Sequence, residues 1–440
     1  MIVVGAGSAG FAAAVAAARA GAHVCVLEKS GAVGGNAAFS HTGFRAAYDG
    51  PDAIAPFVAD LAGYELPGYS VADYAADLDR FGVPPALRDA LAGDSYAALE
   101  WLRELGVRFT FNRSLHGRFE PGLVLAADGL VAAWERIAAA HDVDVWVDAP
   151  VERVVVDEGV LVGGVFMRAD AVIVCSGGFQ ADAARRRRHL GTAGGVVRGS
   201  RHDTGELLEA LIEDGAARAG GWGEAVITPV DAASPPAEGG NRMNRYSYPY
   251  GITVDAAGRR FFDEGSGLLA DTYAVVGRLV LERGGAWQVF DAAGTRLLKR
   301  YAYDFATPRR ADTVAGLGID GLEETVRAFN AACPDGPFDP TRPDGRATIG
   351  LDPPKSHWAV PLREPPFRAY AVTGGVTFTL GGLAVDDGAR VLGEDGAPLP
   401  GVFASGDVIG LFHGGYPSGA GQTRNVVFSR RAAASATGRA

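Results

Sequence analysis

The sequence predicts an α/β protein in which a Rossmann-like nucleotide-binding domain is split by an inserted segment. Three observations support this fold class. The chain opens with an apolar run, a glycine-rich turn and an alanine-rich stretch. Apolar runs that end in glycine-rich turns return near residue 175 and near residue 405. Between them, from about residue 226, the chain becomes rich in proline, glycine and aromatic residues, which is typical of loops and linkers.

The first thirty residues predict a strand, a tight turn, a helix and a second strand. The strand is expected at 2–4, the helix at 11–20 and the second strand at 24–27. Further on, residues 50–145 are expected to be largely helical. Residues 149–175 predict a β-hairpin and a return strand, and a turn follows at 176–179.

The first turn carries the spacing G-x-G-x-x-G. Gly5 permits the tight turn, Gly7 lets the backbone approach a pyrophosphate, and Gly10 lets helix and strand pack closely. The N-terminus of the following helix supplies free N–H groups and partial positive charge. Glu28 lies eighteen residues after Gly10, where an acid accepts hydrogen bonds from a ribose. The segment therefore predicts a dinucleotide site rather than a glycine-rich turn without a ligand.

A second glycine pair follows directly, at Gly34 and Gly35, with Asn36 after it. A loop of this kind suits wrapping of a pyrophosphate and reach toward a flavin. Rossmann domains that bind NAD alone usually continue into a helix at this point. We therefore expect FAD rather than NAD.

Composition limits the function classes. The chain has 440 residues, 48% of them hydrophobic and 21% charged, with a formal net charge of −11. The acidic balance argues against a nucleic-acid partner, and the basic run ARRRRHLG at 184–191 is expected to be a solvated helix face. The cysteines Cys25, Cys175 and Cys333 form no CxxC pair, which predicts neither disulfides nor a metal site and suits the cytoplasm. The N-terminal segment lacks the features of a signal peptide or a membrane span.

Five motifs, in this order, resemble the fumarate reductase/succinate dehydrogenase flavoprotein superfamily: VVGAGSAG, LEKSGAVGGN, IVCSGGF, GGLAVD and GVFASGDVIG. That superfamily also includes 3-ketosteroid dehydrogenases and aspartate oxidase. Within it, FSHTGFRAAYDG, RYSYPYGITVDAAGRRFFDEG, AWQVFD, VTGGVTFTLGGL and LFHGGYPSGAGQ are most similar to tricarballylate dehydrogenases and their CobZ-like relatives.

The resemblance implies an FAD-binding domain in two parts, residues 1–225 and 378–440, with an α+β capping domain at 226–377. Asp407 would bond the ribitol, Val151 would offer backbone to the adenine, and the last helix would face the flavin. The full set of implied FAD-binding residues is Gly5, Gly7, Ala9, Gly10, Glu28, Lys29, Gly34, Gly35, Asn36, Ser40, Thr42, Gly43, Val151, Ser176, Gly177, Gly406, Asp407, Gly421, Gln422, Thr423 and Asn425.

Some relatives link FAD covalently to a histidine that lies about six residues before a glycine pair. His41 lies instead just before Thr42 and Gly43, so we expect non-covalent FAD. The chain contains neither a haem motif nor an iron–sulfur cysteine cluster, so electrons are expected to leave to a separate acceptor or to oxygen.

The chain departs from fumarate reductases at the positions that carry their chemistry. Thr228 and Phe378 stand where those enzymes carry histidines, and Tyr416 stands where they carry a substrate-binding arginine. The segment GSGLLAD at 265–271 lacks their proton-donating arginine. Tricarballylate dehydrogenases also tend to carry an arginine there. These departures argue against simple fumarate reduction and weaken an assignment to tricarballylate itself.

The superfamily reaction removes or adds two hydrogens across a C–C bond next to a carbonyl or carboxylate, with hydride transfer to flavin N5. It needs a clamp for the carbonyl and a group that takes the proton. Tyr416 is the candidate clamp, because YPSGAG resembles the YPGAG of ketosteroid dehydrogenases; packing against the flavin is its alternative. The candidate carboxylate clamps are Arg45, Arg245 and Arg424, each of which could instead form a salt bridge. The acid–base candidates are His413, ranked first, and Tyr250, Tyr248 and Tyr273.

Three functions remain open from the sequence. The first is an FAD-dependent dehydrogenase that makes an α,β-unsaturated product from a small carboxylate or carbonyl substrate similar to tricarballylate. The second is the reverse reaction, an enone or fumarate-type reductase, or a ketosteroid-like desaturase that acts on a specialised metabolite. The third is a flavin-binding protein without catalysis.

Overall fold

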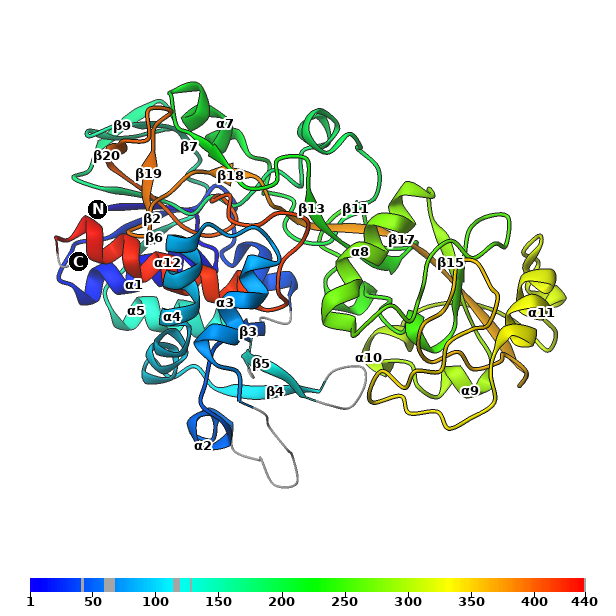
Figure 1. The fold of residues 1–440 in the computed structure, drawn as a ribbon. Coiled ribbons are helices and arrows are strands. Elements are labelled where there is room, and N and C mark those ends of the chain that lie inside the picture. Colours follow the sequence, from blue (N-terminus) through cyan, green and yellow to red (C-terminus); the bar gives the residue numbers. More distant parts are fainter. Residues whose placement is uncertain (41–42, 59–67, 114–118, 127–128, 439–440) are drawn as a thin grey trace.

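The protein forms two lobes that are joined by long strands, as the computed structural model shows (Figure 1). The structure describes residues 1–40, 43–58, 68–113, 119–126 and 129–438. The N-terminal strand β1 (Ile2–Val4) and the C-terminal helix α12 (Ala420–Ala436) both lie in the first lobe (Figure 1). Within the described ranges, none of the helices combines the length and apolar character that a membrane crossing requires.

The first lobe is built on a six-stranded sheet whose central strands are parallel. Its C-terminal strand β20 pairs with β10 beside the N-terminal strand β1, so the two ends of the chain share one sheet. This pairing confirms the predicted fold class, a split Rossmann-like domain. In sheet order the strands are β19 (Arg390–Leu392), β20 (Pro398–Ala404), β10 (Val172–Val174), β1 (Ile2–Val4), β2 (Cys25–Leu27) and β6 (Asp144–Trp146).

Two helices from opposite ends of the sequence pack together on this sheet. α1 (Ser8–Arg19) lies along α12 (Ala420–Ala436), while α4 (Pro85–Glu104) and α5 (Leu130–Ala140) cover them (Figure 1). The alanine-rich face of α1 lets the helices approach closely. α12 begins at Ala420, because Gly419 adopts φ +85° and caps the helix there.

The second lobe contains a sheet in the order β11-β17-β15-β14, with β13 and β16 also paired to β17. Its strands are β11 (Val196–Val197), β13 (Ala225–Asp231), β14 (Ile252–Val254), β15 (Ala286–Phe290), β16 (Arg309–Ala311) and β17 (Phe367–Thr379). α8 (Leu269–Glu282) packs on β13 and β17, and the lobe also holds α9 (Ala292–Thr295), α10 (Arg300–Tyr303) and α11 (Leu322–Ala332). This lobe is the α+β cap.

The antiparallel strands β13 and β17 connect the lobes (Figure 1). Both expected domain boundaries, 225/226 and 377/378, fall inside these strands. The division of the chain at those residues stays a prediction.

Smaller elements complete the two lobes. Residues 50–145, which were expected to be largely helical, contain two strands of a small sheet as well as helices. This sheet forms because Val124 pairs with Phe44, from the segment before residue 50, over a buried apolar cluster. The sheets are β3 (Gly43–Arg45), β4 (Phe109–Arg113) and β5 (Phe119–Ala126); β7 (Val151–Val155), β8 (Gly159–Val162) and β9 (Val165–Arg168); and β12 (Arg218–Ala219) and β18 (Gly382–Leu383). The helices are α2 (Pro51–Ile54), α3 (Val71–Asp79), α6 (Ala183–Arg185) and α7 (Glu206–Glu213).

The basic run at 184–191 is not a uniform solvated face, contrary to expectation. Arg186 is buried, and its guanidinium donates to the carbonyl oxygens of Gln180 and Ala193. One of the four arginines therefore closes a turn of the chain, while Arg187 and Arg188 remain exposed.

Candidate functional site

A cavity of about 700 Å³ lies between the sheet of the first lobe and the cap. This volume falls within the range of small-molecule and cofactor sites, about 300–1,000 Å³. The glycine-rich turn after β1, the loop at 35–43, the turn after β20 and the start of α12 contribute to its wall, together with residues of β13, β17 and α8.

The turn after β1 provides the cradle for a diphosphate. A Cβ added to Gly5 would lie 2.5 Å from the Cys175 oxygen, and one added to Gly10 would lie 1.8 Å from the Gly5 oxygen. These two glycines are therefore required by close packing of the protein itself. A Cβ added to Gly7, which caps α1 and lines the cavity, would meet no atom within 4 Å. The space at Gly7 faces the helix N-terminus, where an anionic phosphate is stabilised.

Glu28 shapes the same turn. One of its carboxylate oxygens accepts a hydrogen bond from the Ala6 N–H at 2.8 Å, and the other accepts from the Ser30 N–H at 2.9 Å. The carboxylate is buried and lines the cavity beside Val151. It thus fixes the turn and still has lone pairs for a ribose hydroxyl.

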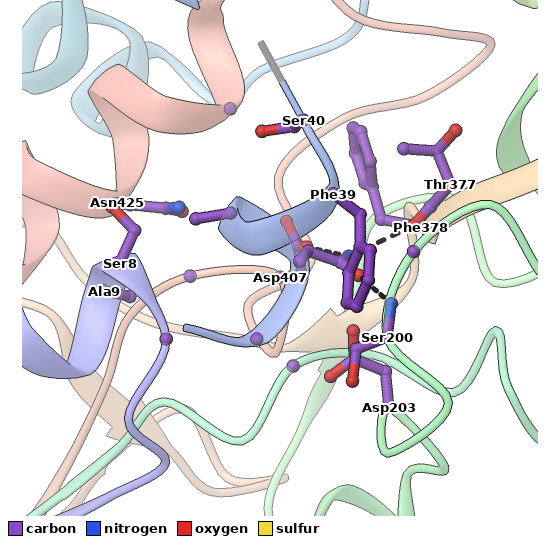
Figure 2. A pocket seen from close by; sticks show the side chains of 18 of the residues that line it. Ser8, Ala9, Phe39, Ser40, Ser200, Asp203, Thr377, Phe378, Asp407 and Asn425 are labelled. Carbon is purple, nitrogen blue, oxygen red and sulfur yellow. Dashed lines mark hydrogen bonds between the residues drawn. The ribbon is translucent and has the colours of Figure 1, made fainter. Parts of the chain in front are cut away.

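Asn36 ties four segments together at the cavity wall, where its partners Ser200, Thr377 and Asp407 are labelled in Figure 2. Its Nδ2 donates to the Thr377 oxygen at 3.1 Å and to Asp407 Oδ2 at 3.3 Å, and its Oδ1 accepts from the Ser200 N–H at 2.9 Å. Because Thr377 belongs to β17, this cluster also connects the loop of the first lobe to the inter-lobe strand.

The carboxylate of Asp407 is held from the other side by Arg424. The Arg424 guanidinium forms an ion pair with Asp407 and lies over the rings of Phe378 and Phe412. Arg424 is 1% exposed, so the ion pair is screened little by solvent on that side. Asp407 itself lines the cavity, where its remaining lone pairs suit a polyol such as ribitol.

The N-terminus of α12 also opens onto the cavity. Gly419, Gly421, Gln422 and Asn425 line it there. Two helix N-termini, those of α1 and α12, thus supply N–H groups and partial positive charge to one cavity. The residues present fit FAD, whose diphosphate and flavin are the two parts that such termini stabilise.

Most of the expected FAD-binding residues line the cavity, and a few lie behind its wall. Those that line it are Gly5, Gly7, Ala9, Glu28, Lys29, Gly35, Asn36, Ser40, Gly43, Val151, Ser176, Gly177, Gly406, Asp407, Gly421, Gln422 and Asn425. Gly10 packs on the Gly5 backbone, Gly34 lies against Val131, and Thr423 Oγ1 donates to the Arg45 oxygen at 2.7 Å. His41 and Thr42 lie outside the described residues.

Another part of the wall is aromatic and suits a substrate. Tyr416 lies edge-on to Phe378 with ring centroids 5.0 Å apart, and Tyr273 lies 5.5 Å from Tyr246. The Tyr273 hydroxyl donates to the Tyr416 hydroxyl at 2.7 Å. Burial raises the pKa of the Tyr416 phenol, and the hydrogen bond from Tyr273 offsets part of that rise. Both phenols therefore stay protonated near neutral pH.

The other acid–base candidates lie away from this wall. His413 is exposed, next to Gly82 on the surface. The Tyr250 hydroxyl donates to the Pro340 oxygen at 3.1 Å, and the Tyr248 hydroxyl pairs with Thr272 Oγ1 at 2.6 Å. The structure brings only Tyr273 of this group together with Tyr416.

The three arginines expected to clamp a carboxylate do not line the cavity. Arg45 donates to the Ser418 oxygen at 2.7 Å and forms an ion pair with Asp77. Arg245 is buried in the cap, where it pairs with Asp231. Arg424 pairs with Asp407 as described above. Each guanidinium is therefore engaged with the protein itself.

Several residues that the sequence interpretation missed line the cavity, above all Arg198, Asp203 and Asn244. Asp203 accepts from Gln180 Nε2 at 2.6 Å, and burial, reinforced by nearby Asp407, raises the pKa of its carboxyl well above the usual value. The only signal for Arg198 and Asp203 was indirect: VRGS and HDTGE, within 197–206, are polar, glycine-containing turns of the kind that approach ligands.

Comparison with known proteins places this geometry among flavoproteins. The chain is 26% identical over 463 residues to an NADH:fumarate oxidoreductase of Klebsiella pneumoniae (strain 342), a match that covers 97% of this chain and 46% of that protein. The chain thus spans about half of that relative's length. It is 27% identical over 355 residues to a 4-oxocyclohexanecarboxylate 2-dehydrogenase of Sinomonas cyclohexanicum, covering 70% of this chain and 60% of that protein.

A solved structure and a family model extend the comparison. The open conformation of a flavocytochrome c3 fumarate reductase matches with a TM-score of 0.76 at 24% identity, covering 100% of this chain and 78% of that one, which shows a shared fold. The family model described as FAD binding domain matches residues 1–422. The chain therefore belongs to the FAD binding domain family, within the fumarate reductase flavoprotein superfamily, and its cofactor is FAD.

Proposed function

We propose that the protein is an FAD-dependent oxidoreductase that removes two hydrogens from the carbons next to a carbonyl group of a small substrate. The observation that carries this proposal is the pair of hydroxyls of Tyr273 and Tyr416 at the cavity wall. Bound FAD supplies the hydride acceptor for such a reaction.

Tyr416 is the proposed anchor for the substrate carbonyl. Its oxygen accepts a hydrogen bond from the Tyr273 hydroxyl, so its own O–H hydrogen is directed away from Tyr273 and toward a ligand in the cavity. Because the phenol stays neutral, it acts as a hydrogen-bond donor to an oxygen that gains negative charge when the neighbouring carbon loses a proton. Donors of this kind are worth about 10²- to 10³-fold in rate.

The cavity supports a carbonyl substrate more than a polycarboxylate such as tricarballylate. The arginines Arg45, Arg245 and Arg424 are engaged in ion pairs with the protein's own carboxylates. The wall near Tyr416 is formed by Tyr246, Tyr273 and Phe378. An aromatic wall of this kind favours a substrate with an apolar carbon frame.

The reverse reaction, reduction of an enone, uses the same anchor. A ketosteroid-like desaturase would also use it, with a larger carbon frame in the cavity. The relatives named above act, by their names, on fumarate and on 4-oxocyclohexanecarboxylate. The second of these combines a ketone with a saturated C–C bond next to it, which is the arrangement that the Tyr416 site suits. The electron acceptor is proposed to be a separate partner or oxygen.

Anaerobic photoreduction of the FAD-loaded protein tests the proposal. Addition of 2-cyclohexen-1-one or 4-oxocyclohex-2-ene-1-carboxylate to the reduced protein is expected to restore the oxidised flavin spectrum, with the saturated ketone as product. Saturated ketones added to the oxidised protein should bleach it. If neither enones nor saturated ketones change the flavin spectrum while fumarate does, the carbonyl assignment is wrong. If nothing changes the spectrum, the protein binds flavin without this catalysis.

A further inference from the structure

Arg198 is a buried cation at the cavity whose protein partners are all neutral. It is 8% exposed and is the one arginine among the described residues that line the cavity. Its Nε donates to Asn244 Oδ1 at 2.9 Å, its Nη2 to Asn241 Oδ1 at 2.6 Å and its Nη1 to Thr377 Oγ1 at 3.5 Å. In the part of the chain that the structure describes, no Asp or Glu forms an ion pair with it.

This arrangement contrasts with the three arginines that were expected to clamp a carboxylate. Arg45, Arg245 and Arg424 each have a carboxylate partner. A buried charge without an opposite charge is costly, and proteins normally compensate it. Amide side chains hold the Arg198 guanidinium in place but do not neutralise it. Three of its five N–H donors are engaged in these contacts, which leaves two for a ligand.

Arg198 also lies close to the proposed carbonyl anchor. Tyr273, Tyr301 and Tyr416 line the same cavity, where burial raises the pKa of each phenol and the positive charge of Arg198 lowers each pKa in part. Its partner Thr377 connects through Asn36 to the cluster that holds Asp407. The guanidinium therefore lies beside β17, whose next residue, Phe378, belongs to the aromatic wall.

We propose that Arg198 is an anion-binding residue of the substrate site and that the substrate is a carboxylic acid with a carbonyl group elsewhere in its frame. The carboxylate would pair with the two free N–H donors of Arg198, while the ketone oxygen accepts from Tyr416. This inference rests on the proposed function for the ketone, but the anion site itself does not. One arginine fits one carboxylate, so the substrate class is a keto-monocarboxylate rather than a polycarboxylate.

Binding of benzoate to the FAD-loaded protein tests this inference without turnover. Benzoate is planar, carries one carboxylate and is not oxidised by flavin, and its binding is followed by the change in the visible flavin spectrum. We expect saturable binding of benzoate and at least tenfold weaker binding of benzamide. Arg198→Gln should weaken benzoate binding by about 10- to 100-fold, the value of a charge-assisted hydrogen bond. Arg198→Lys keeps the positive charge but loses the paired N–H donors of the guanidinium. Its benzoate affinity should lie between those of wild type and Arg198→Gln.

Arg201→Gln is the matched control. Arg201 lies three residues further along, pairs with Glu238 and has a side chain that is 62% exposed. Benzoate affinity should not change in this variant. Asn244→Asp gives a second test that keeps Arg198: a carboxylate at this position would pair with the guanidinium and should also weaken benzoate binding by tenfold or more.

The outcomes separate the two proposals. If wild-type protein does not bind benzoate, or if Arg198→Gln and Asn244→Asp bind it as tightly as wild type, the anion site is wrong. If Arg198→Gln cannot be prepared with FAD, the Asn244→Asp titration decides alone. Loss of benzoate binding in the variants, with no enone reduced by any form of the protein, would support the anion site and contradict the proposed function. Reduction of 4-oxocyclohex-2-ene-1-carboxylate with the same KM in wild type and Arg198→Gln would support the proposed function and contradict the anion site.

Discussion

The hydroxyls of Tyr273 and Tyr416 lie 2.7 Å apart although 143 residues separate them in the chain. Tyr273 belongs to α8 of the cap, and Tyr416 belongs to the loop before α12 of the first lobe. The bond therefore joins the two lobes at the cavity itself. In the proposed function this bond also leaves the Tyr416 hydroxyl to donate to the substrate, so Tyr416 is the group to test first.

Tyr416→Phe should abolish most of the activity and leave FAD bound. The substitution removes one hydroxyl and keeps the ring that packs on Phe378 and Phe412. We expect kcat for enone reduction to fall about 10²- to 10³-fold, because the donor to the developing oxyanion is lost. Steady-state and single-turnover kinetics of the reduced flavin measure the change.

Tyr96→Phe is the control for this substitution. The Tyr96 hydroxyl donates to the Ala53 oxygen at 2.7 Å, away from the cavity lining. Its loss should leave kcat within a factor of two. A Tyr416→Phe protein with the same kcat as wild type would show that Tyr416 only packs the wall, the alternative that the sequence left open.

Gly7→Ala and Gly10→Ala should have opposite effects on stability and FAD binding. A Cβ at Gly7 meets no protein atom within 4 Å but would occupy the proposed diphosphate cradle, so we expect unchanged stability of the apoprotein and weaker FAD binding. A Cβ at Gly10 would lie 1.8 Å from the Gly5 oxygen, so the apoprotein should lose roughly 1–3 kcal/mol or more. Thermal unfolding of the apoprotein and FAD titration by fluorescence quenching measure both effects. Equal losses of stability in the two variants would contradict the assignment.

The nucleotide end of the site was predictable from sequence, whereas the substrate end was not. Gly5, Gly7 and Glu28 lie within one strand–turn–helix–strand unit, so local spacing specifies their arrangement. The substrate wall depends instead on how the cap approaches the first lobe. Tyr273 and Arg198 reach the cavity through the long pairing of β13 and β17, which no local pattern reveals.

The arginine and histidine candidates also show that a position near a motif in the sequence does not predict where the side chain points. Arg45 and Arg424 flank functional motifs in the sequence, but their side chains turn to Asp77 and Asp407. His413 is three residues from Tyr416, yet it is exposed beside Gly82. Proximity in sequence places a residue near the site, and burial with its charge partners decides whether the side chain faces the ligand.

The ion pair of Arg424 and Asp407 should be strongly coupled. Arg424→Met would leave the Asp407 carboxylate without its cation, and we expect the apoprotein to lose about 3–5 kcal/mol. Adding Asp407→Asn to Arg424→Met should restore part of this loss, because the uncompensated charge is then gone. Urea unfolding of the two single variants and the double variant measures the coupling. Additive losses in the double variant would mean that the pair contributes nothing beyond its separate residues.

A second charged cluster is buried in the cap, away from the cavity. Lys355 is 1% exposed, and its Nζ donates to the Gly251 oxygen at 2.6 Å. The buried pair of Arg260 and Glu264 lies beside it. Burial lowers the pKa of the Lys355 ammonium from 10.5 to about 8, although the Glu264 carboxylate opposes that change.

The lowered pKa of Lys355 predicts that the protein gains stability as the pH rises from 8 to 10.5. In this window the lysine of the unfolded chain still binds a proton and the folded one has lost it, so the free energy of unfolding increases with pH. The Lys355→Met variant lacks this titration. Because both proteins contain the same tyrosines, the tyrosine contributions cancel in the difference between their free energies of unfolding. The difference in free energy of unfolding between wild type and Lys355→Met should shift in favour of wild type by about 1–3 kcal/mol between pH 7 and pH 10.5. Urea unfolding at several pH values measures it, and parallel pH profiles of the two proteins would show that Lys355 keeps its ordinary pKa in the fold.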